Sequence, residues 1–282
     1  MCDEKDKGLV AYTDLTRRAF ATLSAAAAGA AMAGCASAQP ITVAERDVSV
    51  QTPDGTVEAA LFPPEGAGAW PGVLFWPDIG GLRPAMRDMG RRLAGSGYVV
   101  LVVNPFYRSG TAAQILTLGR DMEKRMALRG VMTPAAIERD SKAFVAYLDA
   151  LPQTSNARVG VQGYCMGGPL AFRTAAAAPG RVGAVGSFHG GGLVTKDADS
   201  PHLLIGKTNA RYLVAIARND DEKDPEAKTV LRQTFAATGR PAVVEVYAGD
   251  HGWCVPDNGS YNPAEAERGW AALLELYRTS LV

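Results

Sequence analysis

A glycine-flanked cysteine stands between two segments of different character in this chain. The segment Gly163-Tyr164-Cys165-Met166-Gly167-Gly168 follows an apolar run, residues 158–162, that predicts a short buried strand. An alanine-rich stretch, residues 169–178, follows it and predicts a helix. A strand, a glycine-flanked nucleophile and a helix are typical of a nucleophile elbow, in which the central residue has a strained backbone and the glycines allow strand and helix to approach closely. The helix N-terminus then favours a thiolate, whereas the alternative interpretation is that Cys165 is only a small core residue.

A thiol nucleophile needs a base, and the chain offers three histidines. In hydrolases with a nucleophile elbow, the nucleophile, the acid and the histidine follow in this order, each after a strand. His189 is excluded because no Asp or Glu lies between it and Cys165. His202 is separated from the cysteine by only one strand-like run. His251 follows an alternating run, residues 241–248, and is therefore the predicted base.

The acid that orients the base should follow the strand before it. Residues 212–217 form an apolar run that predicts this strand, and an acidic segment, residues 218–222, comes directly after it. Asp220 is the predicted acid, and Asp221 is the alternative because a slip of one residue is invisible in the sequence. Asp224 precedes a proline and is expected to cap the next helix.

From about residue 45 to the C-terminus, the chain resembles the dienelactone hydrolase family of cysteine α/β-hydrolases. This resemblance implies an α/β-hydrolase fold with Cys165 as nucleophile, His251 as base and Asp220 as its partner. It also implies that the backbone N–H groups of Ile79 and Met166 form an oxyanion hole. The segments that carry the resemblance are Trp76–Gly81, Gly97–Tyr98, Asn104–Tyr107, Gly163–Gly168, Ala217–Asp220 and His251–Pro256.

The segments expected to bind substrate depart from the family pattern. Many members have a glutamate, which contacts the resting thiol, at the position of Asp78. Members also bind a substrate carboxylate through arginines, one of them shortly after the catalytic histidine. Here residues 252–256 contain no arginine, and Arg108 is the candidate for the other position. Tyr107 and Trp253 are further substrate-binding candidates, while residues 189–192 are expected to form a flexible loop.

The first 38 residues read as an export signal. Arg17-Arg18 followed by an apolar run, residues 19–33, is typical of twin-arginine export, and Ala36-Ser37-Ala38 suits a cleavage site. Cleavage before Cys35, which would then carry a lipid anchor, is the alternative. We therefore expect a periplasmic or secreted protein, or a membrane-anchored lipoprotein, in which residues 39–282 form one domain.

Alternating strand and helix patterns predict an α/β fold, with a doubly wound, mostly parallel sheet, helices on both faces and two antiparallel strands at its front. The predicted strands are Asp47–Val50, Val57–Phe62, Gly72–Trp76, Tyr98–Val103, Val159–Gln162, Ala184–Phe188, Tyr212–Ala217 and Val243–Tyr247. The predicted helices are Pro84–Ala94, Ala112–Leu128, Ala135–Leu151, Met166–Ala178, Pro225–Thr238 and Pro263–Arg278.

Charge and composition narrow the expected partners. The 29 basic and 29 acidic residues balance, and no nucleic-acid partner is expected. Four arginines around one predicted helix are interpreted as a solvated face: Arg83, Arg87, Arg91 and Arg92. No cofactor is expected, and His251, Cys254 and Asp257 lack a recognised metal-ligand spacing. The expected partners are a small ester or lactone and, during secretion, the twin-arginine export machinery.

The predicted reaction is hydrolysis of an activated ester or lactone, such as a dienelactone, through an acyl-thioester. Two other classes share the same residues. A cysteine amidase or peptidase would use the same triad, and a non-catalytic periplasmic binding or redox-sensing protein would keep the pocket without turnover. A bridge between Cys165 and Cys254 under oxidising conditions is a further hypothesis.

Overall fold

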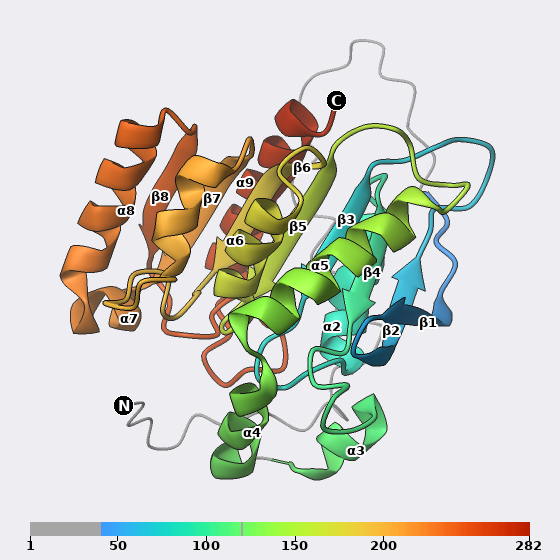
Figure 1. Ribbon diagram of the computed structural model, residues 1–282, viewed down its shortest axis with the longest axis horizontal. Helices are drawn as coiled ribbons and strands as arrows, with labels where there is room; N and C mark the ends of the chain where they lie inside the picture. The colour runs from blue at the N-terminus through green and yellow to red at the C-terminus, as the bar shows by residue number, and fades with distance from the viewer. Residues whose placement is uncertain (1–40, 120) are drawn as a thin grey trace, which may run out of the picture.

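The computed structural model describes residues 41–119 and 121–282, which form one sheet with helices on both faces (Figure 1). The strands are β1 (Arg46–Thr52), β2 (Gly55–Phe62), β3 (Gly72–Trp76), β4 (Val99–Val103), β5 (Val159–Tyr164), β6 (Val182–Phe188), β7 (Arg211–Ala217) and β8 (Ala242–Tyr247). The α-helices are α2 (Pro84–Ala94), α3 (Ala112–Thr117), α4 (Met122–Leu128), α5 (Pro134–Asp149), α6 (Gly167–Ala177), α7 (Arg218–Lys223), α8 (Pro225–Thr238) and α9 (Pro263–Ser280). Two 3₁₀ helices, Arg129–Val131 and Pro201–Lys207, complete the described elements.

The eight strands lie in the order β1-β2-β4-β3-β5-β6-β7-β8. Strand β2 pairs antiparallel with both β1 and β4, and every pairing from β4 to β8 is parallel. The predicted α/β class with a mostly parallel sheet is therefore confirmed. Both pairings at the front are antiparallel, as predicted, but only β2 is reversed, so β1 runs in the same direction as the rest of the sheet.

The sheet has a separate hydrophobic layer on each face. Helices α5, α6 and α8 cover one face, where Phe144 and Phe172 are fully buried. Helices α2 and α9 cover the other, where Met86 and Tyr277 are buried. Because both faces are covered, the central strands are continuous apolar runs, and every residue of Val99–Val103 is buried.

Local capping signals explain which predicted helices have the right boundaries. Helices α2 and α8 match their predicted bounds, and each has a proline in its first turn. Asp224 occupies the N-cap position of α8, although its side chain makes no capping hydrogen bond. The predicted helix Ala112–Leu128 is wrong as a single element and is divided into α3 and α4. Gly119 has a φ of +54° at the break, and the carboxylate of Asp121 caps α4.

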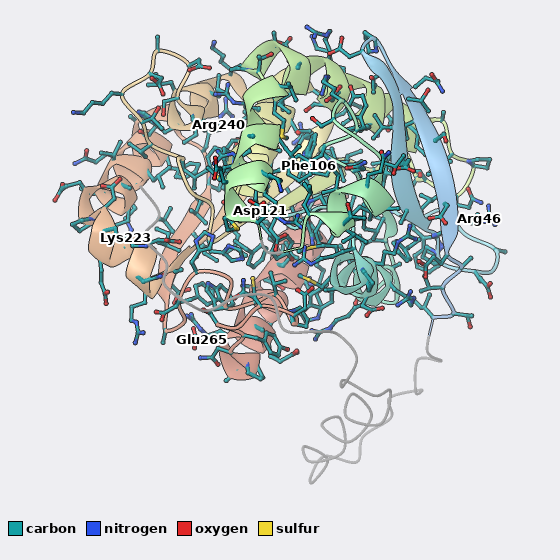
Figure 2. All side chains as sticks on the ribbon, turned by 90° about the horizontal axis from the view of Figure 1, so that it is seen from below. Arg46, Phe106, Asp121, Lys223, Arg240 and Glu265 are labelled. Atoms are coloured by element: carbon teal, nitrogen blue, oxygen red, sulfur yellow. The ribbon has the colours of Figure 1, made fainter. Side chains whose placement is uncertain are left out.

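Helices α3 and α4 lie beyond one end of the sheet, the end at which α7 follows β7 (Figure 1). Figure 2 looks onto this end: Asp121, at the start of α4, lies near the middle of the view, while Arg46 of β1 and Lys223 of α7 lie on opposite sides. The loops after the parallel strands all emerge here, where α/β sheets commonly bind ligands. Among the residues that the structure describes, no helix is both long and apolar enough to cross a membrane.

Candidate active site

Cys165 lies in a turn between β5 and α6 that glycine makes feasible. Its φ is +53°, in the left-handed region that non-glycine residues rarely adopt, and its N–H donates to the carbonyl oxygen of Phe188 at 3.0 Å. A side chain at Gly163 would place its Cβ 1.9 Å from the carbonyl oxygen of Gly167. A side chain at Gly167 would come within 2.5 Å of the carbonyl oxygen of Trp76. Both glycines are therefore required by close backbone contacts, and the sulfur stands at the N-terminus of α6.

The loops after β7 and β8 bring an acid and a histidine together. Nδ1 of His251 lies 2.6 Å from Oδ2 of Asp220, and Oδ1 of Asn219 accepts the N–H of His251 at 2.8 Å. Asp221 instead forms an ion pair with Lys228 at 2.6 Å. The acidic segment is a short helix rather than a loop, so consecutive side chains point about 100° apart. Of the two candidate acids, Asp220 is therefore the one that contacts His251.

The environment of His251 favours its charged form. Burial alone would lower the pKa of the imidazole, but hydrogen bonds and charge interactions with Asp220 and Cys165 outweigh it and raise this pKa from 6.5 to about 11. The Cys165 side chain therefore lies close enough to the imidazole of His251 to interact with it. A cysteine beside a histidine that is oriented by a carboxylate is the arrangement of a nucleophile with its base, so these three side chains are suited to acyl transfer.

The two proposed oxyanion donors lie in the loops that follow neighbouring strands, β3 and β5. Strand β3 pairs with β5, with Trp76 opposite Gly163, so the loop after β3 passes next to the elbow. Nη1 of Arg125, from α4, donates to the carbonyl oxygen of Ile79 at 2.9 Å and holds this loop. Among the described residues, the backbone N–H groups of Ile79 and Met166 donate to no acceptor. Both donors are therefore free to bind an oxyanion.

A buried arginine joins the loop after β3 to the loop that carries the histidine. Nη1 and Nη2 of Arg83 donate to Asp78 at 2.6 and 3.0 Å, while Nε and Nη2 donate to Asp257 at 2.7 and 2.8 Å. Burial disfavours the charge, but the two carboxylates outweigh it and raise the pKa of Arg83. The interpretation of Arg83 as part of a solvated face is wrong, because this side chain is only 4% exposed. No local pattern marks it, since Asp257 lies 174 residues away.

His189 is a buried neighbour of the histidine rather than part of a flexible loop. It is 1% exposed, has a φ of +39°, and its ring lies edge-on to that of His251, with centroids 4.7 Å apart. Burial and the nearby charge of His251 lower the pKa of His189 well below its usual value, so the ring is neutral. Its neutral ring forms one wall around the imidazole of His251.

The structure gives all four substrate-binding candidates other contacts. Asp78 is paired with Arg83, and the carboxylates of Asp54 and Asp140 hold Arg108. The hydroxyl of Tyr107 also binds Asp140, at 2.7 Å. Trp253 is fully buried and stacks on Tyr247, with ring centroids 4.5 Å apart, so it packs in the core. The polar groups of Asp78, Tyr107 and Arg108 are therefore already bound within the protein, and the indole N–H of Trp253 is buried without a hydrogen-bond partner among the described residues.

The remaining sulfur is a core residue. Cys165 and Cys254 are both free cysteines, and burial raises the pKa of the Cys254 thiol well above its usual value. Within residues 41–119 and 121–282, no group of three His, Cys, Asp or Glu side chains is arranged to hold a metal ion. The predicted export signal, residues 1–38, with its alternative lipid site at Cys35, lies outside the described residues.

Sequence comparison identifies relatives along most of the chain. The sequence model of the dienelactone hydrolase family matches residues 57–281. A protein of Synechocystis sp. with the provisional name carboxymethylenebutenolidase is 27% identical over 248 residues, which cover 86% of this chain and all of the relative. Carboxymethylenebutenolidase 1 of Cupriavidus pinatubonensis is 27% identical over 166 residues, or 58% of this chain and 68% of that protein.

The fold also has solved counterparts. A crystal structure from Klebsiella pneumoniae, provisionally named a dienelactone hydrolase, superimposes with a TM-score of 0.75 at 23% sequence identity. The match covers 84% of this chain and 99% of that one. Because identity is this low, the likeness concerns the fold alone, which is the α/β-hydrolase fold.

Proposed function

Since this chain belongs to the dienelactone hydrolase family, and is thereby a hydrolase of esters or lactones, we propose that it cleaves its substrate through a triad of Cys165, His251 and Asp220. One observation carries the proposal. Oδ2 of Asp220 lies 2.6 Å from Nδ1 of His251, and the Cys165 side chain is near enough to the same imidazole to help raise its pKa. A nucleophile, a base and an orienting acid in series are the arrangement that covalent acyl transfer commonly uses.

The proposed reaction has two halves. The thiolate of Cys165 attacks the carbonyl carbon, and the N–H groups of Ile79 and Met166 bind the oxyanion. His251 gives its proton to the leaving alcohol, which departs and leaves an acyl-thioester on the sulfur. The neutral His251 then takes a proton from water, and the resulting hydroxide attacks the carbonyl carbon of the thioester. The carbon–sulfur bond breaks, the acid departs, and the thiolate and imidazolium are restored. Asp220 stabilises the imidazolium whenever His251 carries the proton.

Sulfur restricts the substrate. A thiolate leaves more readily than an ordinary alkoxide, because the pKa of a cysteine thiol, about 8.5, is far below that of an aliphatic alcohol. The tetrahedral intermediate therefore tends to revert unless the leaving alcohol is itself stabilised. We expect enol lactones and aryl esters to be turned over faster than simple alkyl esters or amides. Comparing an aryl ester with the matching anilide separates this function from that of an amidase.

Replacing the nucleophile tests the proposal directly. We expect Cys165→Ala to lower kcat for 4-nitrophenyl acetate by about four orders of magnitude or more, because the covalent route is lost. In the unaltered protein, mass spectrometry at early times should detect an acetyl adduct on Cys165 that disappears as turnover ends. Cys254→Ala, which changes the buried thiol, is the control and should still form the adduct. Near-normal turnover by Cys165→Ala would contradict the nucleophile assignment.

Export of the protein is a separate proposal. It is supported by Arg17-Arg18 and the apolar run that follows, with the small residues 36–38 as the cleavage site. The twin-arginine machinery would be the transient partner, and a lipid at Cys35 is the alternative outcome. Changing both arginines to lysine should leave the protein in the cytoplasmic fraction, and the mass of the exported form distinguishes cleavage from lipidation. Unchanged export of the double-lysine variant would refute this route.

A further inference from the structure

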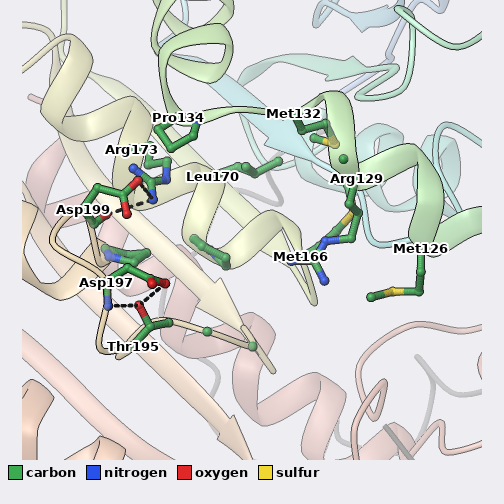
Figure 3. A pocket seen from close by; sticks show the side chains of 15 residues that line it. Met126, Arg129, Met132, Pro134, Met166, Leu170, Arg173, Thr195, Asp197 and Asp199 are labelled. Carbon is green, nitrogen blue, oxygen red and sulfur yellow. Dashed lines mark hydrogen bonds and ion pairs between the residues drawn. The ribbon is translucent and has the colours of Figure 1, made fainter. Parts of the chain in front are cut away.

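A cavity of about 410 Å³ opens beside the residue that follows the nucleophile (Figure 3). It lies between α4, the 3₁₀ helix Arg129–Val131, the first turns of α5 and α6, and the loop after His189. Met166 forms part of its wall, and Gly191-Gly192 close another side. Its volume is within the range of about 300–1,000 Å³ that is typical of small-molecule sites. The proposed triad and oxyanion hole do not by themselves assign a role to this cavity.

The position of the cavity indicates which part of a substrate it receives. The leaving oxygen must lie next to His251, which protonates it. None of the residues that line the cavity comes from the loop that carries this histidine, residues 248–262. The cavity instead begins at Met166, whose N–H is the proposed donor to the carbonyl oxygen. The acyl group of the substrate, which lies on the other side of the carbonyl carbon, therefore points into the cavity.

The apolar part of the cavity lining is adaptable. Figure 3 shows methionine side chains from three different segments around it, together with Leu170 of α6. These methionines are Met126, Met132 and Met166. Methionine is unbranched and polarizable, so it packs against ligands of varied shape.

The charges around the cavity cancel. Arg173 and Asp199 form an ion pair at 3.1 Å. The two other charged residues of the lining, Arg129 and Asp197, have opposite signs. The lining thus has no net charge. A carboxylate on the acyl group would lose hydration here and would meet Asp197 and Asp199 as well as the two arginines, so it would gain no net attraction in return. Arg108 offers no substitute, because two carboxylates already bind it.

We propose that this cavity is the acyl site and that it selects a neutral, apolar acyl group over one that carries a carboxylate. The inference rests on the proposed function, since it assigns the cavity to the substrate of Cys165. It names the substrate class as uncharged esters or lactones with an apolar acyl chain.

Two esters with the same leaving group test the charge selectivity. We expect kcat/KM at pH 7 to be about tenfold or more higher for 4-nitrophenyl butyrate than for mono-4-nitrophenyl succinate, whose acyl group ends in a carboxylate. An equal or higher value for the succinate ester would overturn the inference while leaving the proposed function intact. If the protein hydrolysed none of the three esters (butyrate, succinate and acetate), the proposed function itself would be refuted.

Two variants that change the charge of the lining in opposite directions provide a second test. Asp197→Asn leaves the lining with a net positive charge, and Arg129→Gln leaves it with a net negative one. The butyrate-to-succinate ratio should fall about two- to fivefold in the first variant and rise by a similar factor in the second, as expected for partly solvated charges. A ratio that stays the same in both variants would show that the acyl group does not enter this cavity.

Filling the cavity provides a test that is independent of charge. Met132→Trp should lower kcat/KM for 4-nitrophenyl hexanoate several-fold more than for the acetate, because the longer chain needs the space. Met122→Trp is the matched control: this residue lies on α4 but outside the lining, is 51% exposed, and should leave the hexanoate-to-acetate ratio unchanged. Equal ratios in the two tryptophan variants would contradict the assignment of the cavity.

Discussion

Cys165 and His251 depend on their immediate neighbours for reactivity. The positive φ of Cys165 is compatible with this sheet only because Gly163 and Gly167 permit backbone contacts that a Cβ would block. His251 is flanked by the charge of Asp220 and the neutral ring of His189. One neighbour stabilises the imidazolium, and the other fills space beside it without adding charge. These neighbouring side chains therefore determine the protonation state of His251.

The pH dependence of turnover should report the pairing with Asp220. Because the folded-state pKa of His251 is raised to about 11, the imidazolium persists through neutral pH and is lost only as pH rises toward that value. Asp220→Asn removes the carboxylate, so the pKa should fall and the alkaline limb of the kcat/KM profile should move to lower pH. We also expect kcat to fall by about 10²- to 10⁴-fold.

Asp221→Asn is the control for this pH experiment, because Asp221 pairs with Lys228 instead of His251. This variant should keep the alkaline limb of the kcat/KM profile at the same pH as in the unaltered protein, and it should keep most of kcat. If the two asparagine variants had the same profile, the acid assignment would be wrong.

At the scale of elements, the site depends on how separate loops are held together. Arg83, at the start of α2, binds Asp78 after β3 and Asp257 after β8. Arg125 of α4 binds the carbonyl oxygen of Ile79. These contacts fix the loop after β3, which contains Ile79, relative to the loop that carries His251. Neither arginine needs to touch the substrate.

Breaking the Arg83 contacts should affect both stability and rate. Arg83→Met leaves two buried carboxylates without their partner, which should cost about 3–5 kcal/mol in the free energy of unfolding. Loss of the fixed loop geometry should also lower kcat. Urea denaturation and kcat measured on the same preparation test this expectation.

A second arginine on α2 serves as the comparison. Arg91 is 43% exposed and forms surface ion pairs with Glu45 and Asp88, so Arg91→Met should cost less than about 1 kcal/mol. Similar decreases in the free energy of unfolding in both variants would mean that the buried ion pairs of Arg83 stabilise the protein no more than the surface ion pairs of Arg91.

At the scale of the whole molecule, every proposed site residue lies between Asp78 and Asp257. The sheet itself begins with β1 at Arg46, after the predicted signal. A protein that starts at Gln39 should therefore keep kcat/KM for 4-nitrophenyl acetate within about twofold of the full chain, as is usual for changes remote from a site. A large loss of activity in this shortened protein would show that residues 1–38 contribute to the fold or the site.

The sequence alone determined the features that depend on local pattern. Continuous apolar runs specify buried strands, prolines mark where α2 and α8 begin, and the glycines around Cys165 specify the elbow. The chain order of cysteine, acid and histidine was also readable, because the loops after parallel strands meet at one edge. The α/β class and the family followed from these features.

Only the tertiary structure decided the features that depend on contacts between distant segments. Asp220 faces His251 while Asp221 does not, because a short helix turns the two side chains apart. Arg83 is buried because Asp257, 174 residues away, folds against it. The cavity beside Met166 exists because α4, α6 and the loop after His189 converge there. Burial and pairing follow from the order of strands in the sheet, and that order comes from long-range packing that no local pattern records.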